Sequence, residues 1–265
     1  MTSTPLAAAA FGPNPGLWPL PAAVTGADLW LRAVAAGGQG RYASARADLA
    51  ELVRRRPAGR LASLALSTQG SFLRQQGDHV SARGWDGAAL VRAGQNAEAV
   101  VDALVGLAAD ALGVGRLPTA AALLERAAEL HARADDPPPR LAIRLAWVRA
   151  ELAMAAGDGV AARGFAQRGV ELAAEAGLGL RRHRVKSDVV LAAALCSAGD
   201  LPGARRVGDA VLADGDGAGL VPLCWAVACL LAGIGSARHS PGEVAQIRDR
   251  SAIFVARHGG CLRGG

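Results

Sequence analysis

The chain shows no sustained alternation of apolar and polar residues, the pattern that a half-buried β-strand produces. Its apolar residues fall instead in stretches of helical length that glycines and prolines separate. We therefore predict an all-α protein. The expected helices pair in order along the chain and span residues 27–36, 41–56, 61–76, 80–93, 97–112, 118–134, 141–156, 160–176, 185–198, 202–213, 220–234 and 241–258.

A short motif, Gly–x–[Tyr/His/Leu]–x–x–Ala, marks the expected turn inside most of these pairs. It begins at Gly40, Gly77, Gly115, Gly157 (where glycine takes the third position) and Gly199, with a weaker copy at Gly235. Successive motif glycines lie 37, 38, 42, 42 and 36 residues apart, which is the period of helical-hairpin repeats. Glycine leaves a helix in a left-handed conformation at little cost, and the small alanine lets the second helix approach the first. The motif predicts an α-solenoid of about five to six antiparallel hairpins.

The first repeat resembles the tetratricopeptide repeat. With Gly40 as the turn glycine, the signature positions of the second helix are held by Tyr42, Ala45, Leu49, Leu52 and Pro57, and the second repeat supplies Gly70, Gly77 and Ala82. Later repeats keep Leu124 and Ala127, whereas Ala166 and Gly208 replace a large residue and the final proline is absent. The resemblance covers roughly residues 27–213 and implies a right-handed superhelix.

The same resemblance implies that the first helix of each pair lines an inner groove. The matching groove positions are Trp30, Ser67, Arg74, Gln75, Asp102, Arg144, Trp147, Glu151, Lys186 and Trp225. Polar side chains interspersed with aromatic anchors suit a bound peptide. Two simpler interpretations stay open: Trp147 and Trp225 as ordinary core residues, and Arg144 with Glu151 as solvated charges.

Composition sharpens this picture and adds a second hypothesis. Apolar residues make up 51% of the chain and aromatic residues 4%, so its core must consist of Ala, Leu and Val, which favours closely packed helices. The net charge of +6 suggests nucleic-acid binding, but Lys186 is the only lysine, and such arginine bias is typical of a GC-rich, actinobacterial-like genome. The densest basic cluster is Arg181, Arg182, Arg184 and Lys186, which suits an acidic protein, an anionic lipid surface or a nucleic-acid backbone.

Three segments divide the chain: a flexible Pro/Ala/Gly-rich arm (1–25), the repeat domain (26–258) and a disordered tail (259–265). The arm, which carries Trp18 among prolines, could also fold back into the groove as an internal ligand. The uncharged run 217–237 is interpreted as a buried solenoid helix rather than a membrane span. No basic start of a signal peptide is present, so we expect a cytoplasmic protein.

Motifs for chemistry are scarce. His258 and Cys261 have ligand-like spacing without a second pair nearby, so no metal site is expected, and residues 214–217 are predicted to form a turn. The sequence therefore predicts a non-enzymatic scaffold or adaptor that needs no cofactor and binds a partner peptide or domain in its groove. The alternative is a transcription-related regulator that contacts nucleic acid or polymerase through the basic cluster. A helical-repeat enzyme, with a pocket formed by distant residues, stays as a third interpretation.

Overall fold

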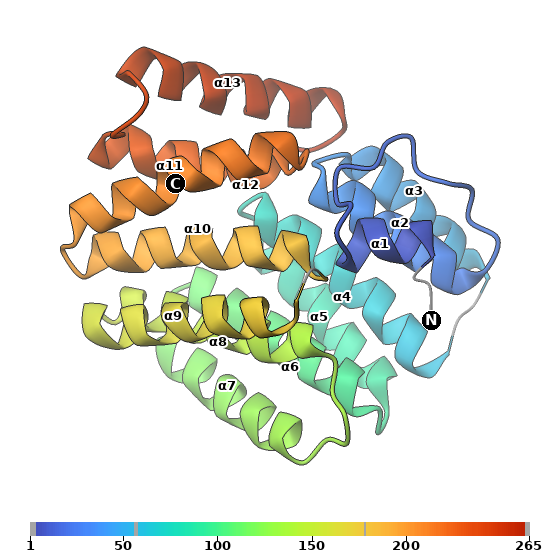
Figure 1. Cartoon of the computed structure of the whole chain (residues 1–265). Helices are drawn as coiled ribbons and strands as arrows, with labels where there is room; N and C mark the ends of the chain where they lie inside the picture. The colour runs from blue at the N-terminus through green and yellow to red at the C-terminus, as the bar shows by residue number, and fades with distance from the viewer. Residues whose placement is uncertain (1–3, 56–57, 178, 263–265) are drawn as a thin grey trace.

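The computed structural model describes residues 4–55, 58–177 and 179–262, and every regular element in these ranges is an α-helix (Figure 1). The thirteen helices are α1 (Pro5–Phe11), α2 (Gly26–Gly38), α3 (Tyr42–Arg54), α4 (Gly59–Gln75), α5 (His79–Ala93), α6 (Ala97–Gly113), α7 (Leu117–Ala132), α8 (Pro139–Ala155), α9 (Gly159–Glu175), α10 (Arg181–Ser197), α11 (Leu201–Gly217), α12 (Val221–Ile234) and α13 (Pro241–Arg257). The predicted all-α solenoid is confirmed for the part of the chain that the structure describes.

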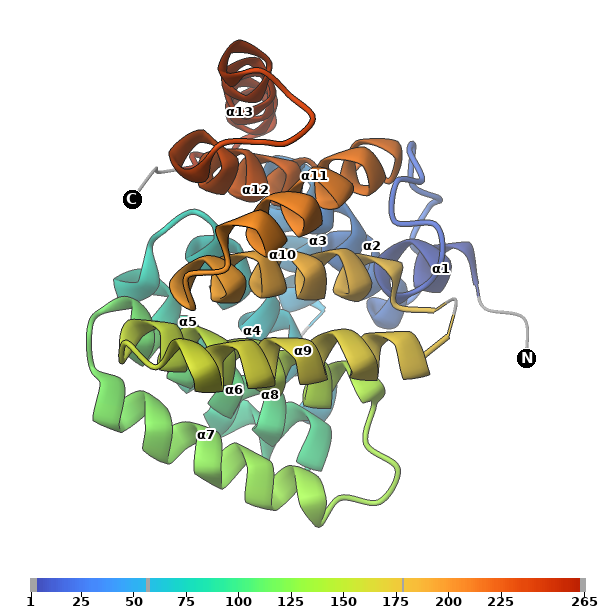
Figure 2. The same ribbon diagram turned by 60° about the vertical axis from the view of Figure 1, so that its left-hand side comes forward.

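Helices α2 to α13 form six successive hairpins, α2–α3 through α12–α13, stacked side by side (Figures 1 and 2). The first helix of each hairpin also contacts the first helix of the next, in the order α2, α4, α6, α8, α10, α12. The second helices pack mainly on their own partner and on the first helix that follows. Consecutive first helices thus approach one another more closely than consecutive second helices do. The first helices therefore form the inner layer of a curved array.

The turn motif does what the sequence predicted. Its glycines have positive φ angles: 81° at Gly40, 81° at Gly77, 75° at Gly115, 77° at Gly157, 83° at Gly199 and 85° at Gly235. The alanines five positions after the first five of these glycines are completely buried: Ala45, Ala82, Ala120, Ala162 and Ala204. All six repeats therefore reverse at a glycine, and in the first five the second helix packs on the first through an alanine. Pro57, the expected end of the first repeat, lies outside the described residues.

Two helix ends differ from the expectation. Helix α11 continues through residues 214–217, where the sequence predicts a turn. Gly215 faces α12 so closely that an added Cβ would lie 2.8 Å from Cys224 Sγ. The glycine there permits close packing instead of breaking the helix. Helix α10 begins four residues before the expected 185, since Leu180 takes a left-handed conformation and bonds to α1.

The segment expected to be a flexible arm contains a helix, α1, that packs on the array. Thr4 caps α1, whose Leu6, Ala9 and Ala10 are buried, and α1 contacts both α2 and α10. Burial of these apolar side chains stabilises the segment in its folded-back position on the inner layer.

The two ends of the array meet. The amide of Ala43 in α3 donates to the carbonyl of His258 at 2.8 Å, and Val255 of α13 belongs to the same buried cluster as Leu29. Part of the expected disordered tail, 259–262, joins this contact: the amide of Cys261 donates to Gln76 Oε1 at 2.9 Å. Residues 263–265 lie outside the described residues. The first and last hairpins thus close the curve on itself.

The uncharged run 217–237 contributes to α12, which has 14 residues. Of the helices in the described ranges, none has both the length and the apolar character needed to cross a membrane.

Close packing of α2 on α4 yields the first prediction. A Cβ added at Gly37 would lie 2.1 Å from Phe72 Cε1, and the Phe72 ring is held against Tyr42 with centroids 5.6 Å apart. Gly37→Ala should lower the free energy of unfolding by about 1–3 kcal/mol through overpacking. At Gly87, in α5, an added Cβ meets nothing within 4 Å, so Gly87→Ala should raise that free energy by about 0.5–1 kcal/mol. Urea denaturation of both variants measures the difference; equal shifts would contradict the packing.

Candidate functional site

The inner layer holds an ionic network that joins α4, α6 and α8. Arg140 Nη1 donates to Asp102 Oδ1 at 2.7 Å and Arg140 Nη2 to Glu98 Oε1 at 2.6 Å. Arg144 also pairs with Asp102, and Arg60 with Glu98. Burial acts to raise the pKa of Asp102, but Arg144 and Arg140 outweigh it and hold that pKa well below its usual range. Each of the two carboxylates is thus shared by two arginines.

A second network lies between α4, α5 and α6. Arg74 pairs with Asp86 and donates from Nη1 to Asp110 Oδ1 at 3.0 Å, while Ser67 Oγ donates to Asp86 Oδ1 at 3.0 Å. Burial raises the pKa of Asp86 to about 7, against the opposing charge of Arg74 and with the help of the Asp110 carboxylate. Two buried carboxylates that share one guanidinium favour a retained proton.

Aromatic side chains gather where α1 meets the inner layer. The Phe11 ring lies 5.4 Å from that of Trp30 and 6.1 Å from that of His183, measured between centroids. The Trp147 ring also stacks on that of His183, with centroids 5.4 Å apart, and the Arg140 guanidinium lies 5.5 Å from the Phe11 centroid. Phe11 of the N-terminal segment therefore occupies a site formed by residues that the sequence assigned to the groove and its neighbours.

The indole nitrogens at this site are satisfied inside the fold. Trp30 Nε1 donates to Thr68 Oγ1 at 3.0 Å, and Trp147 Nε1 donates to Ser187 Oγ at 2.8 Å. Both indole N–H groups are therefore engaged inside the fold, although each tryptophan still borders the Phe11 site.

The remaining predicted groove residues also have intramolecular partners or lie apart. Lys186 Nζ lies 3.4 Å from Glu151 Oε1 and 5.8 Å from the Trp147 centroid. Gln75 Oε1 accepts a hydrogen bond from the Tyr42 hydroxyl at 3.1 Å, and Trp225 is half-buried on α12. The predicted groove residues thus lie on helices of the inner layer. They make separate contacts within the fold and do not line one continuous open groove.

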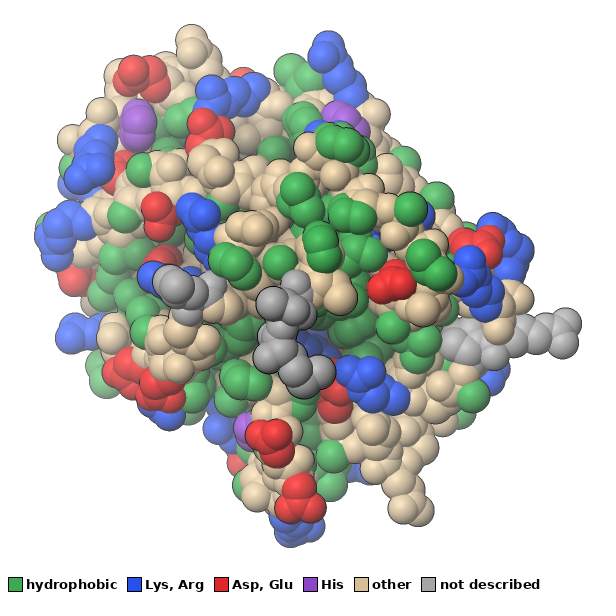
Figure 3. All heavy atoms as spheres, turned by 45° about the vertical axis from the view of Figure 1, so that its right-hand side comes forward, with side chains coloured by type: hydrophobic (Ala, Val, Ile, Leu, Met, Phe, Trp, Pro, Cys, Tyr) green, Lys and Arg blue, Asp and Glu red, His purple; other side chains and the backbone are tan. Residues whose placement is uncertain are grey.

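The predicted basic cluster does not form one surface. Arg184 is exposed, Lys186 pairs with Glu151, and Arg182 lies along Gly38 of α2. Its members follow a helix, so consecutive residues point in different directions. On the face drawn in Figure 3, basic side chains lie interspersed with acidic and apolar ones.

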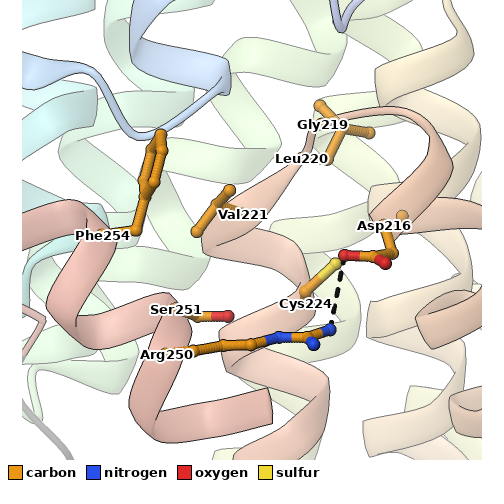
Figure 4. Close-up of a pocket in the computed structure, with 9 residues that line it drawn as sticks. Asp216, Gly219, Leu220, Val221, Cys224, Arg250, Ser251 and Phe254 are labelled. Atoms are coloured by element: carbon orange, nitrogen blue, oxygen red, sulfur yellow. Dashed lines mark hydrogen bonds and ion pairs between the residues drawn. The ribbon is translucent and has the colours of Figure 1, made fainter.

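A hollow of about 250 Å³ that the sequence did not predict lies between α11, α12 and α13 (Figure 4). Its lining comprises Gly215, Asp216, Gly219, Leu220, Val221, Cys224, Arg250, Ser251 and Phe254. Asp216 and Arg250 form an exposed ion pair beside the thiol of Cys224. Burial, followed by the charge of Asp216, raises the pKa of Cys224 to about 11, so the thiol stays protonated near neutral pH and is a poor nucleophile. Within the described ranges, no His, Cys, Asp or Glu cluster is arranged to hold a metal ion.

Comparisons with known proteins leave the family open. No protein-family model matches the chain, and no curated protein matches it. Among solved structures, the chain is similar to the apo form of RapI, with 11% sequence identity and a TM-score of 0.45. The match covers 87% of this chain and 64% of the RapI chain, so this chain spans less than two thirds of that protein. The class that the helices themselves define is an all-α helical-repeat protein.

The Asp86 network predicts a pH dependence of stability. Because the pKa of Asp86 is about 7 in the folded chain and 3.8 is the ordinary value of an aspartate side chain, the folded state retains a proton that the unfolded state releases between these pH values. The stabilisation is fully present below pH 3.8 and is lost as the pH rises through about 7. Buried His183, whose pKa is lowered mainly by burial, acts in the opposite direction, so the comparison must be between variants.

Asp86→Asn should remove this contribution. Relative to the parent chain, the free energy of unfolding of the variant should rise between pH 4 and pH 7.5, by at most about 4 kcal/mol. Chemical denaturation across that pH range measures the difference. Asp135→Asn, at an exposed position, is the matched control and should run parallel to the parent. A parallel curve for Asp86→Asn would contradict the retained proton.

Proposed function

We propose that this protein is a non-enzymatic, tetratricopeptide-like interaction module whose inner layer binds an extended segment of a partner protein. The observation that carries the proposal is the way in which the chain holds its own residues 11–18. The Gln39 side-chain amide donates to the carbonyls of Pro15 and Leu17, at 2.8 and 3.0 Å. One side chain thus binds two main-chain carbonyls, a contact that any extended segment of suitable path could make.

Aromatic anchors flank this backbone contact. Phe11 enters the site between Trp30 and His183, and the Arg41 guanidinium lies 3.9 Å from the centroid of the Trp18 ring. The amide of Leu180 donates to the carbonyl of Phe11 at 2.8 Å. Backbone hydrogen bonds between two aromatic anchors are a common means of peptide recognition.

The N-terminal segment therefore serves as the internal counterpart of the proposed partner peptide. Next to the Phe11 site, the half-buried Trp147, Lys186 and Glu151 extend the same layer. A partner segment would compete with residues 4–20 for this surface. The nucleic-acid alternative gains no comparable observation, since the basic cluster is divided between different faces of α10.

This function predicts that the segment binds in trans. A chain folded intact and then cut at a protease site placed in residues 21–24 should release residues 1–20 on dilution and rebind a synthetic peptide of residues 4–20. A Phe11→Ala peptide should bind at least about tenfold more weakly, because truncation of a half-buried aromatic anchor removes a large part of the binding energy. Fluorescence anisotropy of labelled peptides measures both affinities.

The control is an Asn14→Ala peptide, which changes an exposed side chain and should bind like the parent peptide. Equal binding of the Phe11→Ala and parent peptides would contradict the proposed anchor. Affinity capture with the cut chain, with and without nuclease, then separates a protein partner from a nucleic-acid one.

A further inference from the structure

Arg182 is a shielded cation without a counter-ion in the described part of the chain. It lies in the first turn of α10, and its Nε has no accessible surface and no hydrogen-bond partner. The charges that act most strongly on its pKa are those of Arg144 and Arg140, and both lower it. Burial, and then these two cations, lower the pKa of Arg182 to about 10, so the guanidinium remains charged near neutral pH.

The carboxylates that pair with Arg140 and Arg144 are each shared by two arginines. Asp102 accepts from both Arg140 and Arg144, while Glu98 pairs with Arg140 and Arg60. Arg60, Arg140 and Arg144 thus share two carboxylates, and Arg182 adds a fourth positive charge to this region. His183 does not change the balance: its pKa lies well below the usual value, chiefly because it is buried, so the imidazole is neutral at pH 7.

The position of Arg182 is defined by close packing. A Cβ added at Gly38 of α2 would lie 2.9 Å from Arg182 Cδ and 3.4 Å from Nη1, so the side chain runs directly along the glycine backbone. The residue is only part-buried although its Nε is shielded, which leaves accessible surface on the rest of the side chain. The guanidinium is therefore held between α2 and α10 with room for a further contact.

We propose that Arg182, supported by Arg140 and Arg144, binds an oxyanion, a phosphate or carboxylate group of a small ligand, between α2, α8 and α10. A shielded cation surrounded by other cations is unfavourable, and an anion removes that penalty. A guanidinium fork matches the oxygens of phosphate and carboxylate groups with two parallel hydrogen bonds. The site adjoins the contacts of the N-terminal segment, since Arg140 also lies over the Phe11 ring, but its test does not depend on the proposed peptide-binding function.

The test uses the full chain with inorganic phosphate, pyrophosphate and acetate as probes, added at constant ionic strength against sodium chloride. At least one oxyanion should raise the melting temperature in a saturable manner, since a ligand that binds only the folded state stabilises it. Arg182→Gln should abolish this rise. Without the oxyanion, the same variant should melt no lower than the parent, because the substitution removes an uncompensated charge.

Two further variants sharpen the test. Arg184→Gln removes the same charge from an exposed position on the same helix and should keep the full response. Gly38→Ala keeps all charges but displaces the Arg182 side chain, and should weaken oxyanion binding about tenfold or more, even if Arg182→Gln does not fold. Response to phosphates alone or to acetate alone identifies the ligand group. No rise beyond chloride, or equal rises in Arg182→Gln and the parent, would overturn the proposal.

Discussion

The close approach of the first helices to one another is the constraint on which this structure depends. The turn glycines and the completely buried alanines, such as Ala82 and Ala162, let the helices of each hairpin pack tightly, and the inner helices touch in sequence from α2 to α12. An array that is tighter on one layer than on the other must curve. Here the curve continues until α13 meets α3, so the inner layer is largely internal instead of an open groove.

Long charged side chains on such an inner layer cannot all reach solvent, and this explains the two ionic networks. Arg140 connects α8 to α6 through both Glu98 and Asp102, and Arg74 connects α4 to α5 and α6. Buried ion pairs contribute little net stability because desolvation offsets their attraction, but a wrong pairing leaves a charge uncompensated. The networks therefore act chiefly on register: they favour the one stacking of hairpins in which every carboxylate meets its arginines.

Local features of the chain were predictable, and contacts across the curve were not. The helices around Gly77 and Gly115 were located to within a few residues, because glycine turns and apolar stretches are encoded over short distances. Residues on the inner layer, such as Trp147, were placed on the correct helix by the repeat period. The arm could be expected to fold back into the groove, but the contact between Phe11 and His183 was not predictable, since it joins α1 to α10, which lie far apart in the sequence. Likewise Gly215 resembled a loop glycine until α12 was seen beside it.

The two proposed sites meet at the first turn of α10, and this adjacency couples them. The amides of Leu180 and Arg181 donate to the carbonyls of Phe11 and Gly12, so the N-terminal segment holds the start of the helix that carries Arg182. A partner that displaces the segment would free these amides and alter the position of Arg182 over Gly38. An oxyanion that fixes Arg182 would in turn stabilise the start of α10 and the segment bound to it. By thermodynamic linkage, each ligand changes the affinity for the other by the same factor. An oxyanion bound at Arg182 would then lower the affinity of the inner layer for the partner segment, and the partner segment would lower the affinity of Arg182 for the oxyanion.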